Sequence, residues 1–295
     1  MKKMLTVFTP TYNRADLLSC AYEALQRQTS SNFKWLVIDD GSTDNTKDVV
    51  ESWIKENKID ITYVYKENGG LHTGYNKAIE LLDTELCVCV DSDDYLFDNA
   101  VETICEEWAI YKDENIAGLV GYDCALDGNI LTGRWSEGKI SHYVTMKQKT
   151  KFHGDDKIVM KVSLLKQVYP QPTIEGEKNF NPIWLILKLD QLAPFAFIDK
   201  KICWVNYQNT GMAANIVKQY FNSPQSFMEL RKLQVNLKYV GLPFKLRNYI
   251  HLIAEAKIAK KNIFKESVNV WMIVLLYPLG MLLYFYLLKL KHDER

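Results

Sequence analysis

Short apolar runs alternate with amphipathic stretches over the first 122 residues, and this alternation restricts the fold more than any other feature. The runs are rich in β-branched and aromatic residues, which predicts strands, and apolar residues at helical spacing lie between them. Strands that alternate with helices form βαβ units around a mainly parallel sheet, so the sequence predicts an α/β fold. The expected strands are 4–9, 33–38, 61–65, 86–90 and 116–122, and the expected helices are 14–28, one that follows Ser42 and Thr43, 73–82 and 99–111.

Polar clusters follow three of the predicted strands. They are 10–14 (Pro-Thr-Tyr-Asn-Arg), 39–44 (Asp-Asp-Gly-Ser-Thr-Asp) and 91–94 (Asp-Ser-Asp-Asp). The strand before the last cluster, 86–90, holds only leucine, cysteine and valine, so we expect it to be buried on both faces. Ligands of parallel α/β sheets bind beyond the carboxyl ends of the strands. The three clusters are therefore expected to meet at one edge of the sheet.

The acid cluster at 91–94 places three carboxylates within four residues. At the end of a buried strand such charges need a counter-charge, and a divalent cation supplies one. Oxygen ligands suit Mn²⁺ or Mg²⁺, with Asp91 and Asp93 as the candidate ligands. An acidic turn that caps the helix expected from residue 99 is the alternative, and the cluster alone leaves both open. The spacing of an EF-hand calcium loop is absent.

The other two clusters fit a nucleotide but also have plain structural explanations. A carboxylate at 39–44 can accept a base N–H or bind ribose hydroxyls, while Ser42, Thr43 and Asp44 suit helix capping. The cluster at 10–14 offers a backbone turn and an aromatic ring on which a base could stack. Neither a Walker A loop nor a G-x-G-x-x-G sequence is present, so those two phosphate-binding loops are not supported.

The charge balance and the cysteines indicate which partners and which cellular compartment to expect. Lys+Arg and Asp+Glu are balanced at 36 each, which argues against a nucleic-acid partner. The six cysteines form no C-x-x-C pair and no secreted disulfide pattern, so we expect reduced thiols in a cytoplasmic core. The first residues lack the apolar run and cleavage site of a signal peptide.

The second half of the chain shows weaker periodicity. We expect helices at 158–168, 183–190 and 217–264, a strand at 195–207 and a loop at 170–182. The run 268–288 carries no charge, has lysines on both sides and is long enough to cross a bilayer as a helix. Pro278 and Gly280 could kink it into an interfacial hairpin. We favour membrane attachment over the alternative, a helix docked on the soluble body.

Taken together, the ordered motifs resemble the family 2 glycosyltransferases of GT-A architecture. This resemblance implies a Rossmann-type, mostly parallel sheet flanked by helices, with a helical C-terminal extension. It also implies a nucleoside diphosphate sugar donor, most commonly UDP-linked, a divalent metal (Mn²⁺ or Mg²⁺), and inversion at the anomeric carbon. The match is carried by Thr9–Arg14, Asp39–Asp44, Asn68-Gly69-Gly70 with Asn76-Lys77-Ala78, and Asp91–Asp94.

The resemblance assigns roles by position. Pro10, Tyr12 and Asp40 would hold the base and ribose. Asp93 would bind the metal, and Asp91 would contact the ribose, the sugar or the metal. The full set of residues expected at the donor is Pro10, Tyr12, Arg14, Asp40, Asn68, Gly70, Asn76, Asp91 and Ser92.

Two later segments, 154–157 (Gly-Asp-Asp-Lys) and 175–178 (Glu-Gly-Glu-Lys), resemble a bacterial surface-polysaccharide subgroup. The chain departs from the family just before the helix expected at 183–190. Family members commonly have a Glu-Asp pair there that includes the catalytic base, whereas this chain has Asn-Pro-Ile-Trp at 181–184. Glu177 is the first candidate for the base, followed by Glu175 and Asp155. Tyr75 stands where many relatives have an arginine, and 207–215 lacks the histidine that relatives often place near the metal.

The implied organisation has four parts: a nucleotide-sugar-binding half at 1–122, an acceptor-binding half at 123–215, a helical extension at 216–266 and a membrane-associated segment at 267–295. The expected activity is sugar transfer to a glycan or lipid-linked acceptor at the cytoplasmic face of the membrane, in bacterial surface polysaccharide synthesis. A non-catalytic nucleotide-sugar-binding protein and a sugar nucleotidyltransferase remain as alternatives.

Overall fold

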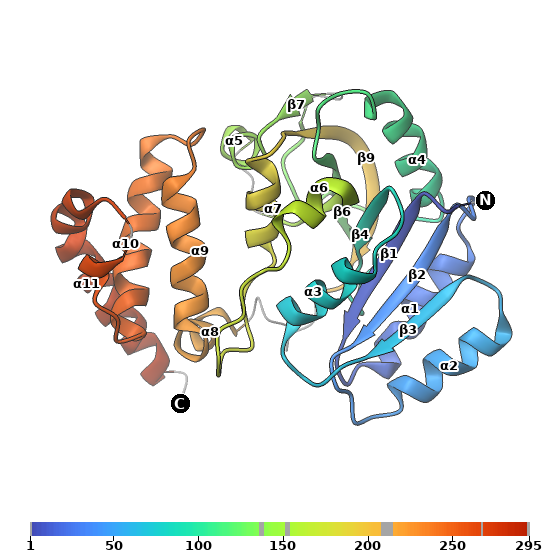
Figure 1. Cartoon of the computed structure of the whole chain (residues 1–295), viewed down its shortest axis with the longest axis horizontal. Coiled ribbons are helices and arrows are strands. Elements are labelled where there is room, and N and C mark those ends of the chain that lie inside the picture. The colour runs from blue at the N-terminus through green and yellow to red at the C-terminus, as the bar shows by residue number, and fades with distance from the viewer. Residues whose placement is uncertain (1, 136–138, 151–153, 208–214, 267, 294–295) are drawn as a thin grey trace. The chain divides into compact units, whose positions relative to one another are not determined.

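The computed structural model describes residues 2–135, 139–150, 154–207, 215–266 and 268–293. The chain divides into two compact units (Figure 1). The sheet unit comprises 1–69, 73–171 and 188–208, and the helical unit comprises 70–72, 172–187 and 209–295.

The sheet unit is built on one mixed sheet. In the described residues it has nine strands, eight of them in the order β3-β2-β1-β4-β8-β6-β9-β5, with β7 paired to β9. Strands β1 to β4 are parallel to one another, as are β6 and β9, while β8 runs antiparallel between β4 and β6. The strands are β1 (Leu5–Thr11), β2 (Phe33–Asp39), β3 (Ile61–Tyr65), β4 (Leu86–Cys89), β5 (Tyr95–Leu96), β6 (Gly118–Ala125), β7 (Lys139–Ser141), β8 (Asp156–Lys161) and β9 (Phe195–Val205).

Helices cover both faces of this sheet. Alternate residues of β1, such as Leu5 and Val7, join a core with the buried faces of α1, α2 and α4. On the opposite face the ring of Phe8 meets Tyr75 of α3 edge-on, with ring centroids 5.1 Å apart. The helices of the sheet unit are α1 (Ala15–Gln26), α2 (Thr46–Glu56), α3 (Leu71–Leu81), α4 (Ala100–Tyr111), α5 (Tyr143–Lys149) and α6 (Val162–Val168). Helix α7 (Ile183–Asp190) begins in the helical unit and ends in the sheet unit.

The prediction of a helix at 158–168 is wrong for the first part of that range. Asp156–Lys161 is strand β8, and helix α6 begins only at Val162. In β8, Val159 pairs with Val88 of β4 on one side and with Leu119 of β6 on the other. Pairing on both sides satisfies the backbone hydrogen bonds of a segment that is too short for a stable helix. The other expected strands and helices of the first 122 residues are confirmed within a few residues.

The helical unit holds α8 (Ile216–Asn222), α9 (Pro224–Asn236), α10 (Leu242–Ile258), a 3₁₀ turn at Ile263–Lys265 and α11 (Val270–Asp293). The predicted helical stretch 217–264 is thus three helices. Two of them carry proline in the first turn, where its missing N–H costs nothing. Helices α10 and α11 pack closely at Gly280, because a Cβ there would lie 2.5 Å from the Cβ of Ile253.

Helix α11 contains the uncharged run 268–288 almost entirely, with Pro278 inside it. Ile273 and Leu276 are buried against the helical unit. Much of the rest is exposed, including Trp271 at 83% and Leu275 at 69%. By length and composition α11 is able to cross a membrane, and 22% of its most apolar window is buried. These properties are also compatible with a helix that stays on a soluble protein.

Candidate active site

The three polar clusters meet at one edge of the sheet, as predicted. The register of β1 and β2 places Thr11 opposite Asp39, so both strands end together. Hydrogen bonds then join the loops that follow: the backbone N–H of Asn13 donates to Ser42 Oγ at 2.9 Å, and the N–H of Ala15 donates to Asp44 at 3.2 Å. Residues far apart in sequence therefore form one continuous polar rim.

Arg14 links this rim to the acid cluster after β4. Its guanidinium lies 3.2 Å from Asp93 Oδ2 and donates to Ser92 Oγ at 3.2 Å. The Asp93 side chain is 15% exposed, while Ser92 is buried. Tyr12, two residues before Arg14, is 47% exposed and so offers a ring to solvent. Asp91 belongs to the same cluster as Asp93. This edge of the sheet therefore carries a cation, two carboxylates and an aromatic ring.

Asp40 is held by its neighbours rather than left open. Its carboxylate pairs with the ammonium of Lys66 and accepts the backbone N–H of Gly69 at 2.9 Å. Asn68 donates to the Asp40 carbonyl oxygen at 2.7 Å. Gly41 has a φ of +85°, and a Cβ there would lie 2.8 Å from the Asn68 nitrogen, which explains a glycine at this turn. Asp40 and Asn68 were predicted from the sequence, whereas Lys66 was not.

The antiparallel strand β8 brings further charges to the same edge. Its N-terminal end lies beside the C-terminal ends of β4 and β6, with Asp156 opposite Tyr122. The buried ammonium of Lys157 lies 3.7 Å from Asp94 Oδ2 and 3.6 Å from Asp123 Oδ1. Sequence reasoning missed Lys157 and Asp123 as a pair, because only the position of β8 in the sheet brings them together.

Burial governs the protonation of these groups. It raises the pKa of Asp94 to about 6 and that of Asp123 to about 8, and the nearby Lys157 ammonium opposes both shifts. For Lys157 burial alone would lower the pKa, but the surrounding acids, led by Asp123, raise it well above its usual value. Lys157 therefore stays charged and is the counter-charge to a buried acidic group.

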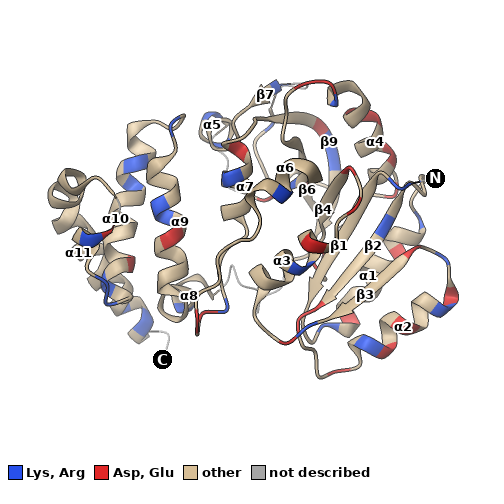
Figure 2. Ribbon diagram, in the orientation of Figure 1, with Lys and Arg blue, Asp and Glu red and all other residues tan. Residues whose placement is uncertain are grey.

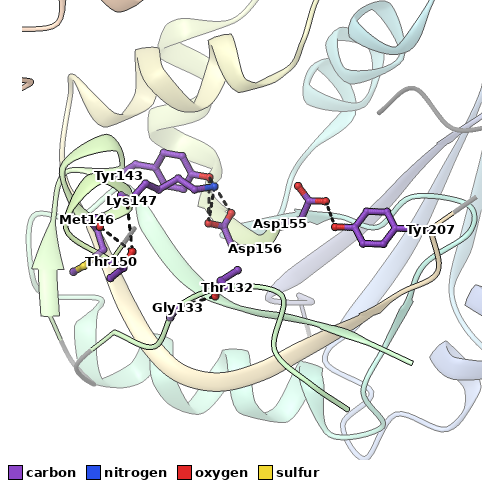
Figure 3. A network of polar contacts seen from close by, with 9 residues as sticks. All are labelled: Thr132, Gly133, Tyr143, Met146, Lys147, Thr150, Asp155, Asp156 and Tyr207. Carbon is purple, nitrogen blue, oxygen red and sulfur yellow. Dashed lines mark hydrogen bonds and ion pairs between the residues drawn. The ribbon is translucent and has the colours of Figure 1, made fainter. Parts of the chain in front are cut away.

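Two neighbouring carboxylates before and in β8 have different partners (Figure 3). Asp156 is buried and accepts the hydroxyl of Tyr143 at 3.0 Å, with Lys147 at 3.4 Å. Asp155 is exposed, and its Oδ2 accepts the hydroxyl of Tyr207 at 2.7 Å. Asp156 is thus part of the packing, whereas Asp155 remains accessible from solvent.

Glu177, the first candidate for a base, caps a helix. Its Oε1 accepts the N–H of Gln225 at 2.9 Å, and its Oε2 accepts both the N–H and the hydroxyl of Ser226, at 2.7 and 2.6 Å. It is 8% exposed, whereas Glu175 is exposed. Both oxygens of Glu177 therefore serve the N-terminus of α9, where a carboxylate satisfies unpaired backbone donors.

Two of the expected donor-binding residues also have structural partners. The side-chain amide of Asn76 donates to the Gln171 carbonyl at 2.8 Å and accepts the Gln171 N–H at 2.9 Å. Gly70 belongs to the helical unit, with a φ of +93°. The stretch 208–214, which includes most of the segment noted for its lack of histidine, lies outside the described residues.

The acid cluster can be tested for its fit to a divalent metal. In the described residues no three His, Cys, Asp or Glu side chains converge on one point as a metal cage would need. Mg²⁺ in nucleotide sites is bound by one or two carboxylates, with phosphates and water as the other ligands. Asp91 and Asp93 supply such carboxylates at the sheet edge, so the donor set fits a metal that arrives with a diphosphate.

Comparison with known families agrees with this architecture. The model of glycosyl transferase family 2 matches residues 6–168, more than half of the chain. The chain therefore belongs to glycosyltransferase family 2, which confirms the resemblance. It is 29% identical over 147 residues to the glycosyltransferase GlyG of Streptococcus pneumoniae serotype 4 (strain ATCC BAA-334 / TIGR4), with 49% of this chain and 45% of GlyG covered.

A second relative is the chondroitin synthase of Pasteurella multocida (strain Pm70), 29% identical over 114 residues, which are 39% of this chain and 12% of that protein. The matched part of the chain thus spans less than half the length of either relative.

Solved structures show the same GT-A fold. S. aureus TarS 1-349 in complex with UDP-GlcNAc matches with a TM-score of 0.59 at 18% identity, covering 94% of this chain and 78% of that one. The mannosyltransferase PcManGT from Pyrobaculum calidifontis, in complex with GDP-Man and Mn²⁺, matches with a TM-score of 0.57 at 18% identity, covering 96% and 81%. The predicted fold class is confirmed.

Proposed function

We propose that this glycosyltransferase moves a sugar, with inversion, from a nucleoside diphosphate sugar to a hydroxyl of a glycan or lipid-linked acceptor in bacterial surface polysaccharide synthesis. The observation that carries the proposal is the polar rim at the ends of β1, β2 and β4, which joins Arg14 to Asp93. The neighbours solved with UDP-GlcNAc and with GDP-Man support a nucleotide-sugar donor, and we take UDP as the nucleotide.

Asp93, with Asp91, would hold a divalent ion, Mn²⁺ or Mg²⁺, beside the donor's diphosphate. Such an ion supplies neutralisation of the charge that develops on the departing nucleoside diphosphate. Arg14 lies 3.2 Å from Asp93, and among the described residues it is the cation that pairs with this carboxylate. Its guanidinium would turn to the diphosphate and bind it as a fork of donors.

Asp155 is our choice for the base that takes the acceptor's proton. Asp155 directly precedes β8, and its charge is close enough to help raise the pKa of the buried Asp123. Asp123 and Asp94 both lie beside the Lys157 ammonium, so Asp155 lies near the acid cluster. Tyr207 donates to Asp155 Oδ2 and so orients the carboxylate. Glu177 lacks this freedom because both its oxygens cap α9.

Turnover of paired variants tests the base. Asp155→Asn should lower kcat by about 10²- to 10⁴-fold, the usual contribution of a general base, with the donor KM little changed. Glu177→Gln and Asp156→Asn are the controls, and each should keep its kcat in the fraction that is folded. A full kcat in Asp155→Asn together with a collapse in Glu177→Gln would assign the base to Glu177 instead.

Nucleoside diphosphate release from a panel of nucleotide sugars tests the donor and the metal. We expect slow, acceptor-free hydrolysis of one or two donors with Mn²⁺ or Mg²⁺, and its loss in EDTA. Asp93→Asn should remove this metal dependence. Full activity in EDTA would contradict the metal role, while tight binding of UDP without any turnover would favour a non-catalytic binding protein.

We also propose that α11 attaches the protein to the cytoplasmic face of the membrane, where a lipid-linked acceptor would be found. The support is the exposed apolar surface of α11, including Leu275, Leu282 and Phe285. Leu282→Glu combined with Phe285→Glu should move the protein from the membrane to the soluble fraction of a cell lysate. An unchanged distribution would contradict attachment through this helix.

A further inference from the structure

A groove in the helical unit gathers positive charge at the end of the apolar helix α11. It has a volume of about 650 Å³. Lysines of α10 and the turn after it line one side, and the last part of α11 lines the other. Figure 2 shows basic residues in blue in these segments. The residues that define this lysine groove are Lys257, Lys260, Lys261 and Lys291, with the aromatic rings of Phe221 and Tyr284.

The lysine groove holds more positive charge than its surroundings balance. Among the described residues no carboxylate lines it, and none of its four lysines forms an ion pair there. Lys291 instead lies over the ring of Phe221, with 4.1 Å between its ammonium and the ring centroid. The ammonium groups repel one another, so an anion that enters the groove gains energy from all of them.

The negative ends of the helix dipoles offset only part of the positive charge of the four lysines. Gly280 packs on Ile253, and further along Tyr284 and Lys257 line the same groove, so α10 and α11 run in the same direction. Their two C-terminal ends therefore approach the groove together. Each helix end contributes about half a negative charge, or roughly one in total for the pair. The charge on four lysines exceeds this severalfold.

An apolar surface continues from the groove along α11. Leu282 is 67% exposed, Phe285 is 60% exposed, and Leu288 lines the groove itself. A ligand that matches both features carries a compact anionic group joined to hydrocarbon chains. Lysine side chains place a charged end at such a boundary while their methylene stems lie on apolar surface.

We propose that the lysine groove binds the phosphate of an anionic membrane phospholipid, with its acyl chains along the exposed apolar face of α11. The residues of this headgroup site all belong to the helical unit, whereas the transfer chemistry proposed above uses residues of the sheet unit. It gives the helical unit a preference for anionic over zwitterionic membranes, which the apolar helix alone would not supply.

Vesicle binding by the full chain tests the site. The probe is phosphatidylcholine vesicles with and without phosphatidylglycerol, followed by co-sedimentation. Lysines near an anionic surface contribute about five-fold each, so Lys257→Gln, Lys260→Gln and Lys261→Gln together should weaken binding to the anionic vesicles by roughly a hundred-fold. Binding to phosphatidylcholine alone should stay as in the parent chain.

A charge-matched control distinguishes the effect of the groove lysines on binding from the effect of the protein's net charge. Lys55, Lys112 and Lys238 are exposed and, among the described residues, form no ion pair, and replacing all three by Gln removes the same total charge. None of these three lysines lines the groove, so this control should bind nearly as the parent does. An equal loss in both triple variants would overturn the proposal.

Two further measurements complete the test. Lys291→Gln alone should weaken binding to the anionic vesicles by about five-fold, and it checks the result if the triple variant folds poorly. Inorganic phosphate, added at constant ionic strength, should compete only weakly. Equal binding to both vesicle types, or full displacement by inorganic phosphate, would contradict a lipid headgroup site.

Discussion

Lys157 is the only cation that the described residues place between Asp94 and Asp123, so replacing it by methionine probes how the acidic edge is held together. Methionine keeps the length and apolar stem of the side chain and removes the charge. Two carboxylates, buried at 6% and 2% exposure, would then face each other without a counter-charge. The loss should appear first as stability, because all three groups lie inside the sheet unit.

The geometry sets the size of the effect. At 3.6 and 3.7 Å, and with an effective dielectric constant near 20, each pair contributes about 4–5 kcal/mol of Coulomb energy before desolvation when its carboxyl group is ionised. Removing the lysine also removes its own desolvation cost, which offsets part of this. Breaking a buried pair from one side typically costs about 3–5 kcal/mol. We expect Lys157→Met to lower the free energy of unfolding by about 4 kcal/mol.

The pH dependence of the loss has a definite sign. The pKa of Asp123 is raised to about 8 in the folded protein, so the folded state binds this proton more tightly than the unfolded state does. Stability from this group therefore falls as pH rises from the unfolded pKa toward the folded one. Without Lys157 the folded pKa rises further, so the loss in Lys157→Met should be larger near about pH 8 than near about pH 5.

Urea unfolding in EDTA, at both pH values, measures this loss without a contribution from bound metal. Lys161→Met is the matched control: it makes the same substitution on the same strand, at an ammonium that lies over the Trp108 ring instead of between carboxylates. It should cost less than about 1 kcal/mol. Equal losses in the two variants, or a larger loss at the lower pH, would refute the assigned role of Lys157.

Three further stability predictions use the same urea assay, and each loss should appear in the unfolding of the helical unit. Glu177→Ala removes the cap of α9 and should cost about 1–2 kcal/mol, and a cost near zero would contradict the capping role. The guanidinium of Arg231 lies 3.1 Å from Glu255, so Glu255→Ala leaves it without its buried partner and should cost about 3–5 kcal/mol. The double variant Arg231→Met with Glu255→Met removes both charges and should cost less. Gly280→Ala forces a Cβ to within 2.5 Å of the Ile253 Cβ and should cost about 1–3 kcal/mol, and a cost near zero would contradict the close packing of α10 and α11.

Local signals explain why the first half of the fold was predictable. The strands that became β1, β2 and β4 are apolar runs closed by polar clusters, and both the period and the cluster are visible in a short window. The parallel topology then follows from their alternation with helices. The meeting of Arg14 with Asp93 could be expected in outline, although the sequence alone gave no distance between them.

Strand β8 was not predictable by the same means. Asp156–Lys161 becomes a strand because β4 and β6 pair with it from both sides, and those partners come from distant parts of the chain. A segment whose hydrogen bonds depend on such partners has no local signature. Missing β8 as a strand also hid Lys157, whose ion pairs exist only because β8 runs antiparallel into the acidic edge.

Residue type and position in the sequence were not enough to identify a candidate for the catalytic base. The chain lacks the Glu-Asp pair before α7, and α7 begins with Ile183 and buries Leu185 and Leu187, so its first turn offers no carboxylate. Glu177 was the nearest acid in sequence, but a helix start about fifty residues later takes both its oxygens. Asp155 is farther away in sequence, yet strand pairing carries it to the acidic edge in the same compact unit. A carboxylate is available as a base only where the fold leaves an oxygen unoccupied beside the site, and topology rather than sequence spacing decides that.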